Sequence, residues 1–72
     1  MSALHAFVLR RDEDETGVSG VGVVAQGVEF TDGVVALHWM TNGPRSTAIY
    51  NSIQDVADIH GHGGKTRIVW LP

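Results

Sequence analysis

Apolar and polar residues alternate with the two-residue period of β-strands in most of this sequence. Residues 34–40, VVALHWM, show the pattern most clearly, because Val35, Leu37 and Trp39 fall on one face and the intervening side chains on the other. Other runs rich in Val, Ile and aromatic residues predict four more strands. These lie at residues 5–11, 21–30, 46–51 and 65–71.

Glycine and aspartate mark where these strands turn or bend. Asp32-Gly33 is a strong hairpin signal and predicts a two-residue turn between the second and third strands. Gly22 and Gly27 interrupt the second strand and predict a bend or bulge in it. Residues 41–46, TNGPRS, are typical of a loop, because an Asn-Gly pair followed by Pro cannot continue a central strand.

One short helix is predicted before the last strand. Ser52 is suited to the N-cap, with Asp55 three residues later as in a capping box. Four residues at helical spacing form one stripe, which needs burial if a helix of two turns is to persist. They are Ile53, Val56, Ala57 and His60. We expect the helix to end at His60, with Gly61 in a left-handed conformation.

Five short strands with a single helix before the last one are typical of a small SH3-like barrel, a mainly β fold. A chain of 72 residues allows one domain, residues 1–72, and no repeat or linker divides it. Cysteine is absent, so no disulfide supports this small core. Good packing or self-association must supply the stability. A second copy of the chain, in a homodimer, is therefore one possible partner.

Composition and charge narrow the function classes. The formal net charge of −3 gives no overall attraction to nucleic acid or anionic lipid, although folding could still gather the five basic residues. No apolar run approaches the roughly 18 residues of a membrane span, and no basic leader precedes one. We therefore expect a cytoplasmic protein that does not enter a membrane.

The segment DIHGHGGKT, residues 58–66, suggests chemistry but is better explained as a helix end and a turn. A phosphate-binding loop needs a glycine where Ile59 stands, and it lies after a strand and before a helix, the reverse of the order here. Zinc needs three or four ligands, and His60 and His62 have few partners in this chain. We predict no cofactor and no metal. No nucleophile motif is present either, so we expect no enzyme activity.

The segments TGVSGVGVVAQGVEFTDGVVALHW, STAIYNSIQDV and IHGHGGKTRIVWL together give the chain a specific pattern. In this pattern, VSGxGxVAxGVxFxDG followed by IHGHGG, it resembles a family of short, uncharacterised proteins of actinobacteria, their phages and haloarchaea. The likeness extends from about Phe7 to Leu71. It implies a self-contained soluble protein, an accessory phage product or a small host regulator, and it transfers no catalytic or binding residues.

Two function classes stay open. The favoured one is a non-enzymatic protein that binds another protein through the loops of the barrel, since small barrels commonly bind peptides there. Acidic loop residues would favour a basic partner and aromatic residues would anchor it, with Trp70 as a further candidate anchor. The residues predicted for this site are Asp12, Glu13, Asp14, Glu15, Trp39 and Tyr50.

The alternative is a small barrel that binds nucleic acid, by stacking bases on aromatic rings and pairing phosphates with basic residues. It requires the basic side chains to converge on one surface. They are Arg10, Arg11, Arg45, Lys65 and Arg67. Arg10 and Arg67 lie on the first and last strands, which often pair in such barrels, but the net acidity makes nucleic acid the less favoured partner.

Overall fold

The computed structural model describes residues 4–12, 22–40, 44–61 and 64–72. Its elements follow one another in the predicted order, and each lies within one residue of its predicted bounds. They are β1 (His5–Arg11), β2 (Gly22–Glu29), β3 (Val35–Trp39), β4 (Thr47–Tyr50), α1 (Ile53–His60) and β5 (Thr66–Trp70). The mainly β class and the single helix before the last strand are thus confirmed.

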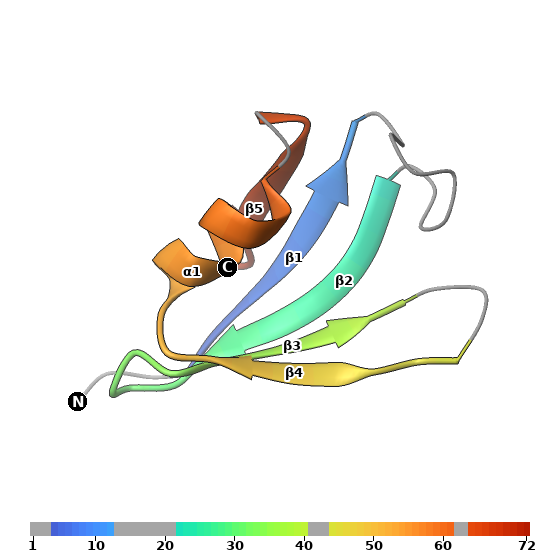
Figure 1. The fold of residues 1–72 in the computed structure, drawn as a ribbon. Coiled ribbons are helices and arrows are strands. Elements are labelled where there is room, and N and C mark those ends of the chain that lie inside the picture. The colour runs from blue at the N-terminus through green and yellow to red at the C-terminus, as the bar shows by residue number, and fades with distance from the viewer. Residues whose placement is uncertain (1–3, 13–21, 41–43, 62–63) are drawn as a thin grey trace.

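The strands form one antiparallel sheet in the order β4-β3-β2-β1-β5 (Figure 1). In the described part of the chain β4 and β5 are the two edges, and they do not pair, so the prediction of a closed barrel is wrong. The reason is the helix. It crosses from β4 to β5 and covers the inner face of the curled sheet, where a closed barrel would place facing strands.

The core lies between this helix and one face of the sheet, which we call the inner face. Register fixes the face: Phe7 on β1 is opposite Gly27 on β2 and Trp70 on β5, and Gly27 is opposite Leu37 on β3. The apolar side chains buried here are all at most 1% exposed. They are Phe7, Leu9, Val24, Ala25, Val35, Leu37 and Val56.

The predicted irregularity in β2 is present, at Val24. Leu9 pairs with Ala25 while Arg10 pairs with Val23, so Val24 is an extra residue in β2. The bulge turns two consecutive side chains, Val24 and Ala25, toward the core, which strict alternation would not allow.

Gly27 allows Phe7 to lie across β2. A methyl group at Gly27 would be 2.8 Å from Cε1 of the Phe7 ring and 2.9 Å from the carbonyl oxygen of Ala36. Real Cβ contacts are longer than this, so glycine is required for the ring to lie this close to the strand.

The hairpin between β2 and β3 has a three-residue loop, not the predicted two-residue turn. The amide of Gly33 donates to the carbonyl of Phe30 at 3.0 Å, and the amide of Phe30 donates to the carbonyl of Val34 at 2.8 Å. Gly33 has a φ of 94°, and a left-handed residue in the third position is typical of three-residue loops. The side chain of Asp32 accepts a hydrogen bond from the amide of Val34 at 3.1 Å, which fixes this loop.

The helix begins as predicted but ends differently. The Ser52 hydroxyl accepts a hydrogen bond from the amide of Asp55 at 3.2 Å, which is an N-cap. At the other end Gly61 is right-handed, with φ −70°, so the predicted left-handed Gly61 is wrong. Gly64 takes that conformation instead, with φ 93°, and the Gly61 carbonyl accepts from the amides of Gly64 and Thr66. The chain therefore reverses after the helix, through a turn that leads into β5.

Candidate functional site

Three rings from three elements meet at the C-terminal end of α1. The Tyr50 hydroxyl lies 2.7 Å from Nε2 of His60, within hydrogen-bond distance. The Trp39 ring packs edge to face against the imidazole, with centroids 4.8 Å apart. Tyr50 also packs edge to face, at 5.7 Å. We call Trp39, Tyr50 and His60 the aromatic cluster; all three side chains are half-buried.

The fold brings these rings together because Trp39 and Tyr50 lie on the inner face of neighbouring strands. Val35 on β3 pairs with Tyr50 on β4, and Trp39 lies further along the same face of β3. His60 reaches them from the last turn of α1, on the stripe that also carries Val56. Edge-to-face packing and the hydrogen bond hold the rings in one arrangement.

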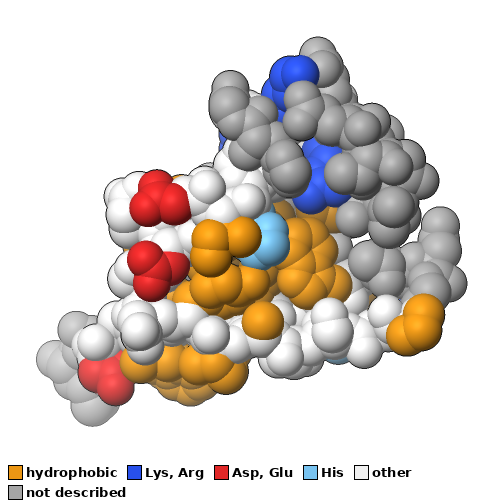
Figure 2. All heavy atoms as spheres, in the orientation of Figure 1, with side chains coloured by type: hydrophobic (Ala, Val, Ile, Leu, Met, Phe, Trp, Pro, Cys, Tyr) orange, Lys and Arg blue, Asp and Glu red, His pale blue; other side chains and the backbone are white. Residues whose placement is uncertain are grey.

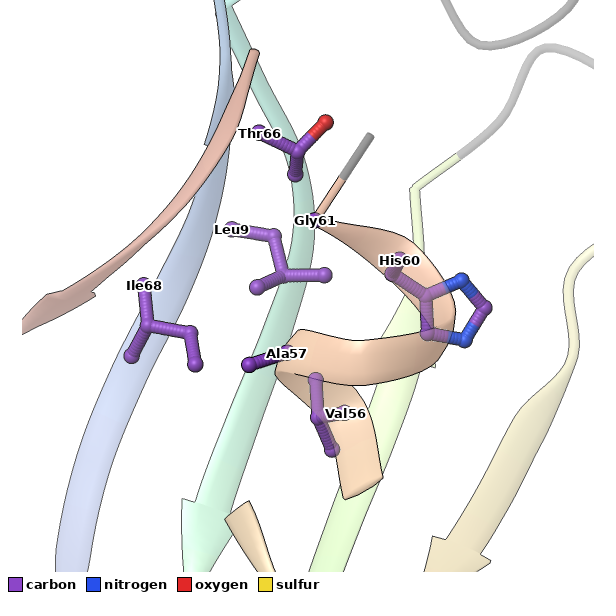
Figure 3. Close-up of a pocket in the computed structure, with 7 residues that line it drawn as sticks. All are labelled: Leu9, Val56, Ala57, His60, Gly61, Thr66 and Ile68. Atoms are coloured by element: carbon purple, nitrogen blue, oxygen red, sulfur yellow. The ribbon is translucent and has the colours of Figure 1, made fainter. Parts of the chain in front are cut away.

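A small cavity adjoins the cluster between α1 and the β1–β5 strands (Figure 3). It has a volume of about 60 Å³. Its walls come from the helix end and from the inner face of the two strands: Leu9, Val56, Ala57, His60, Gly61, Thr66 and Ile68. Pockets for small organic ligands measure about 300–1,000 Å³, so this cavity is far too small for one. It has room for an apolar side-chain tip or a few water molecules.

Arg11 is a buried charged residue next to this cavity. It is 5% exposed, and its Nε donates to Oγ1 of Thr66, a cavity residue, at 3.1 Å. The two residues are directly opposite on β1 and β5. The hydroxyl of Thr66 therefore satisfies part of a guanidinium group that would be costly to bury without hydrogen bonds.

The surface over α1 is apolar with charge at its borders. Figure 2 shows hydrophobic side chains gathered around a histidine on the face that carries α1, with acidic side chains on one side and basic ones at the far end. Ile59, which precedes His60 in the last turn of the helix, is 60% exposed. Asp55 and Asp58 of the same helix are acidic neighbours of this surface.

The predicted protein-binding residues are separated by the fold. Trp39 and Tyr50 both join the aromatic cluster, whereas Asp12 lies at the end of β1 and pairs with Arg67 at 3.2 Å. Glu13, Asp14 and Glu15 lie outside the described residues. Trp70 is at the opposite end of β5, where it stacks on His5 with ring centroids 4.2 Å apart. The sequence placed His60 on the helix stripe and at the helix end, and His60 was weighed with His62 as a zinc ligand, but it was not joined to Trp39 and Tyr50 as part of one site.

Four of the five basic residues converge at one end of the sheet, where β1 ends and β5 begins. Arg10 is directly opposite Arg67, and Arg11 opposite Thr66, with Lys65 just before β5. They do not share one surface, since Arg11 is on the inner face and its neighbour Arg10 on the outer one. Arg45 precedes β4 at the far edge, three strands from β1, or roughly 14 Å away by strand spacing.

Among residues 4–12, 22–40, 44–61 and 64–72 there is no group of three His, Cys, Asp or Glu side chains that could hold a metal ion. His62, one half of the considered His60–His62 pair, lies outside those ranges. In the same described ranges no helix is both long and apolar enough to cross a membrane.

Comparison with known protein families gives a match. The family model described as Acb5 phage protein matches residues 4–72. No curated protein and no solved structure matches the chain.

Proposed function

The chain belongs to the Acb5 phage protein family, and we propose that it is a small accessory phage protein that acts without catalysis by binding another protein. The contact surface is the aromatic cluster together with Ile59 at the end of α1. The wider distribution that the sequence resemblance implies, in actinobacteria, their phages and haloarchaea, stays a prediction, as does a likeness to SH3 domains.

The observation that carries the proposal is an exposed apolar side chain beside rings that are already ordered. Ile59 is 60% exposed at the same helix end as the Tyr50–His60 hydrogen bond. Binding energy in protein interfaces is concentrated in buried aromatic and apolar anchors, and ordering them beforehand lowers the entropy lost on binding. A partner that covers this helix end gains apolar burial without rearranging the rings.

The size of the cavity agrees with a protein partner. About 60 Å³ cannot hold a cofactor or metabolite, but it can admit the tip of one side chain from a partner. Charge indicates which kind of partner fits. Asp55 and Asp58 border the apolar surface, so a basic surface on the partner would be complementary.

Nucleic acid is the second candidate, and the convergence of Arg10, Lys65 and Arg67 at one end of the sheet favours it. Two features oppose it. Asp12 already pairs with Arg67, and Arg11 donates to Thr66 on the inner face. The ion pair offsets the charge of Arg67, and burial keeps the Arg11 guanidinium away from phosphates, so we rank this function below protein binding.

The test is affinity capture from host lysate with the tagged protein, with and without nuclease and at two salt concentrations. Ile59→Lys places a charge on the proposed contact surface that repels a basic partner, and a cation near a helix C-terminus does not weaken the helix. Ile49→Lys is the matched control, because Ile49 is 66% exposed on another surface.

We expect a partner that survives nuclease, is lost with Ile59→Lys and is kept with Ile49→Lys. Capture that disappears with nuclease, or falls steeply with salt, would support the nucleic-acid function instead. Capture that is unaffected by Ile59→Lys would contradict the proposed surface.

A further inference from the structure

The face of the sheet turned away from α1, which we call the outer face, carries three hydrogen-bonding side chains in one row. Gln26 on β2 is directly opposite His38 on β3, and His38 is directly opposite Thr47 on β4. Nδ1 of His38 lies 2.7 Å from Oγ1 of Thr47, so a hydrogen bond joins two members of the row. Directly opposite side chains have their Cβ atoms about 4.5–5.5 Å apart, so neighbouring members can contact the same small molecule.

An open hollow of about 240 Å³ adjoins this row. The three polar side chains line it, and the rest of its lining is apolar side chain or backbone from Gly27, Val28 and Ala36. Binding sites for small molecules combine an apolar surface with a few placed polar groups, and those for drug-sized ligands measure about 300–1,000 Å³. The hollow has this composition, but its size fits a smaller molecule.

A cation stands beside the row at its β4 end. The amide of Trp39 donates to the carbonyl of Ser46 at 2.9 Å, so the pairing of β3 with β4 continues beyond His38 and Thr47. Alternation then places Arg45 on the outer face, two residues or about 7 Å from Thr47. Arg45 is exposed, and within the described ranges it forms no ion pair. Its long side chain can therefore reach over Thr47 to the rim of the hollow.

The polar groups around the hollow can donate hydrogen bonds to an anion. In the tautomer in which the Thr47 hydroxyl donates to Nδ1 of His38, Nε2 carries the ring proton and is left for a ligand. Arg45 adds a planar fork of N–H donors that matches the two oxygens of a carboxylate. Its one positive charge balances the single charge of a carboxylate, whereas a phosphate monoester carries about −1.5 to −2 at pH 7.

We propose that the outer face binds a small organic acid. Arg45 and Nε2 of His38 hold the carboxylate, and the apolar body of the acid lies in the hollow over Val28 and Ala36. The site is open to solvent and the ligand is small, so the dissociation constant is roughly 1–10 mM. The site lies on the opposite side of the sheet from the end of α1, so it is separate from the proposed protein-binding surface.

The test is a titration of the isotope-labelled protein with sodium benzoate to about 50 mM at constant ionic strength, followed in amide nuclear magnetic resonance spectra. Benzamide, the same ring without a charge, is the matched control ligand. We expect saturable shifts at Ala36, His38 and Thr47 with benzoate, and at least tenfold weaker binding of benzamide. Arg45→Gln should weaken benzoate binding at least fivefold. Arg10→Gln makes the same change on the outer face three strands away and should weaken it less than twofold.

A second variant tests the hydrogen bond that orients the imidazole. Thr47→Val keeps a branched side chain but removes the hydroxyl, and it should also weaken benzoate binding. Circular dichroism checks that the variants fold. The proposal is overturned by an absence of saturable benzoate shifts, by equal binding of benzamide, or by an equal loss of binding with Arg10→Gln. Inorganic phosphate that binds as tightly as benzoate would overturn the assignment of a carboxylate.

Discussion

The inner face of this sheet and the outer face, which is turned away from α1, both carry apolar side chains, yet only the inner face is covered. On the inner face Phe7, Leu9 and Leu37 are at most 1% exposed beneath α1, whereas on the outer face Ile49 is 66% exposed. The strand residues account for part of the difference, since the outer face also carries the polar Gln26, His38 and Thr47. The rest comes from α1, which packs on the inner face and leaves the outer face open.

An apolar face therefore has two possible meanings in a small protein. It is core where the chain supplies a second layer, and it stays open to solvent or to a partner where the chain does not. In this molecule the helix serves both purposes, because it covers the inner face with Val56 and presents Ile59 outward from the same turns.

The largest loss of stability is expected from a substitution on the inner face. Phe7→Ala should lower the free energy of unfolding by about 3–5 kcal/mol, since a large buried ring is replaced by a cavity. Val28→Ala, on the outer face of the neighbouring strand, should lower it by less than about 1 kcal/mol in dilute protein, because little buried surface is removed. Urea denaturation of both variants measures the difference, and equal losses would contradict the assignment of the faces.

A smaller loss of stability is expected at the N-terminus of α1, the helix that covers the inner face. Ser52→Ala removes the hydroxyl that caps α1 and should destabilise the protein by about 1 kcal/mol. Ser46→Ala, at an exposed serine before β4, is the matched control and should change stability by no more than about 0.5 kcal/mol. Thermal unfolding of the two variants compares them. A Ser52 variant as stable as the control would mean that the helix end is held by packing alone.

The smallest loss of stability is expected at the exposed ion pair between the end of β1 and β5. Arg67 and Asp12 form an ion pair at 3.2 Å, but their side chains are 56% and 50% exposed. Asp12→Asn should cost at most about 0.5 kcal/mol, and the difference from wild type should vanish at about 1 M salt, where exposed pairs are screened. Urea denaturation at low and high salt checks this, and a loss above 1 kcal/mol that salt does not reduce would show that the pair is more than a surface contact.

The sequence was sufficient to predict the strands and the helix, but not to predict whether the sheet closes into a barrel. Alternation located β3 and the cap at Ser52 located α1, because both signals are local. Closure depends on whether β4 and β5 meet, which is decided by where the helix packs. The conformation of Gly61 was also beyond local reasoning, since the carbonyl of that residue bonds to amides further along the chain.

The candidate site was predictable only in part, for the same reason. Trp39 and Tyr50 were recognisable as aromatic anchors, but nothing in the sequence shows that His60 lies between them or that Asp12 lies on Arg67 instead. The bulge at Val24 shifts the alternation of β2, so faces counted through that strand from sequence are wrong on one side of it.

The most direct test of the two-face account is thiol labelling of two variants, Ile49→Cys on the outer face and Leu37→Cys on the inner face, since the sequence has no cysteine of its own. We predict that Ile49→Cys reacts in the folded protein and that Leu37→Cys reacts only when the protein unfolds, because Ile49 is 66% exposed and Leu37 is 0% exposed. Equal labelling rates in the folded protein would contradict the account.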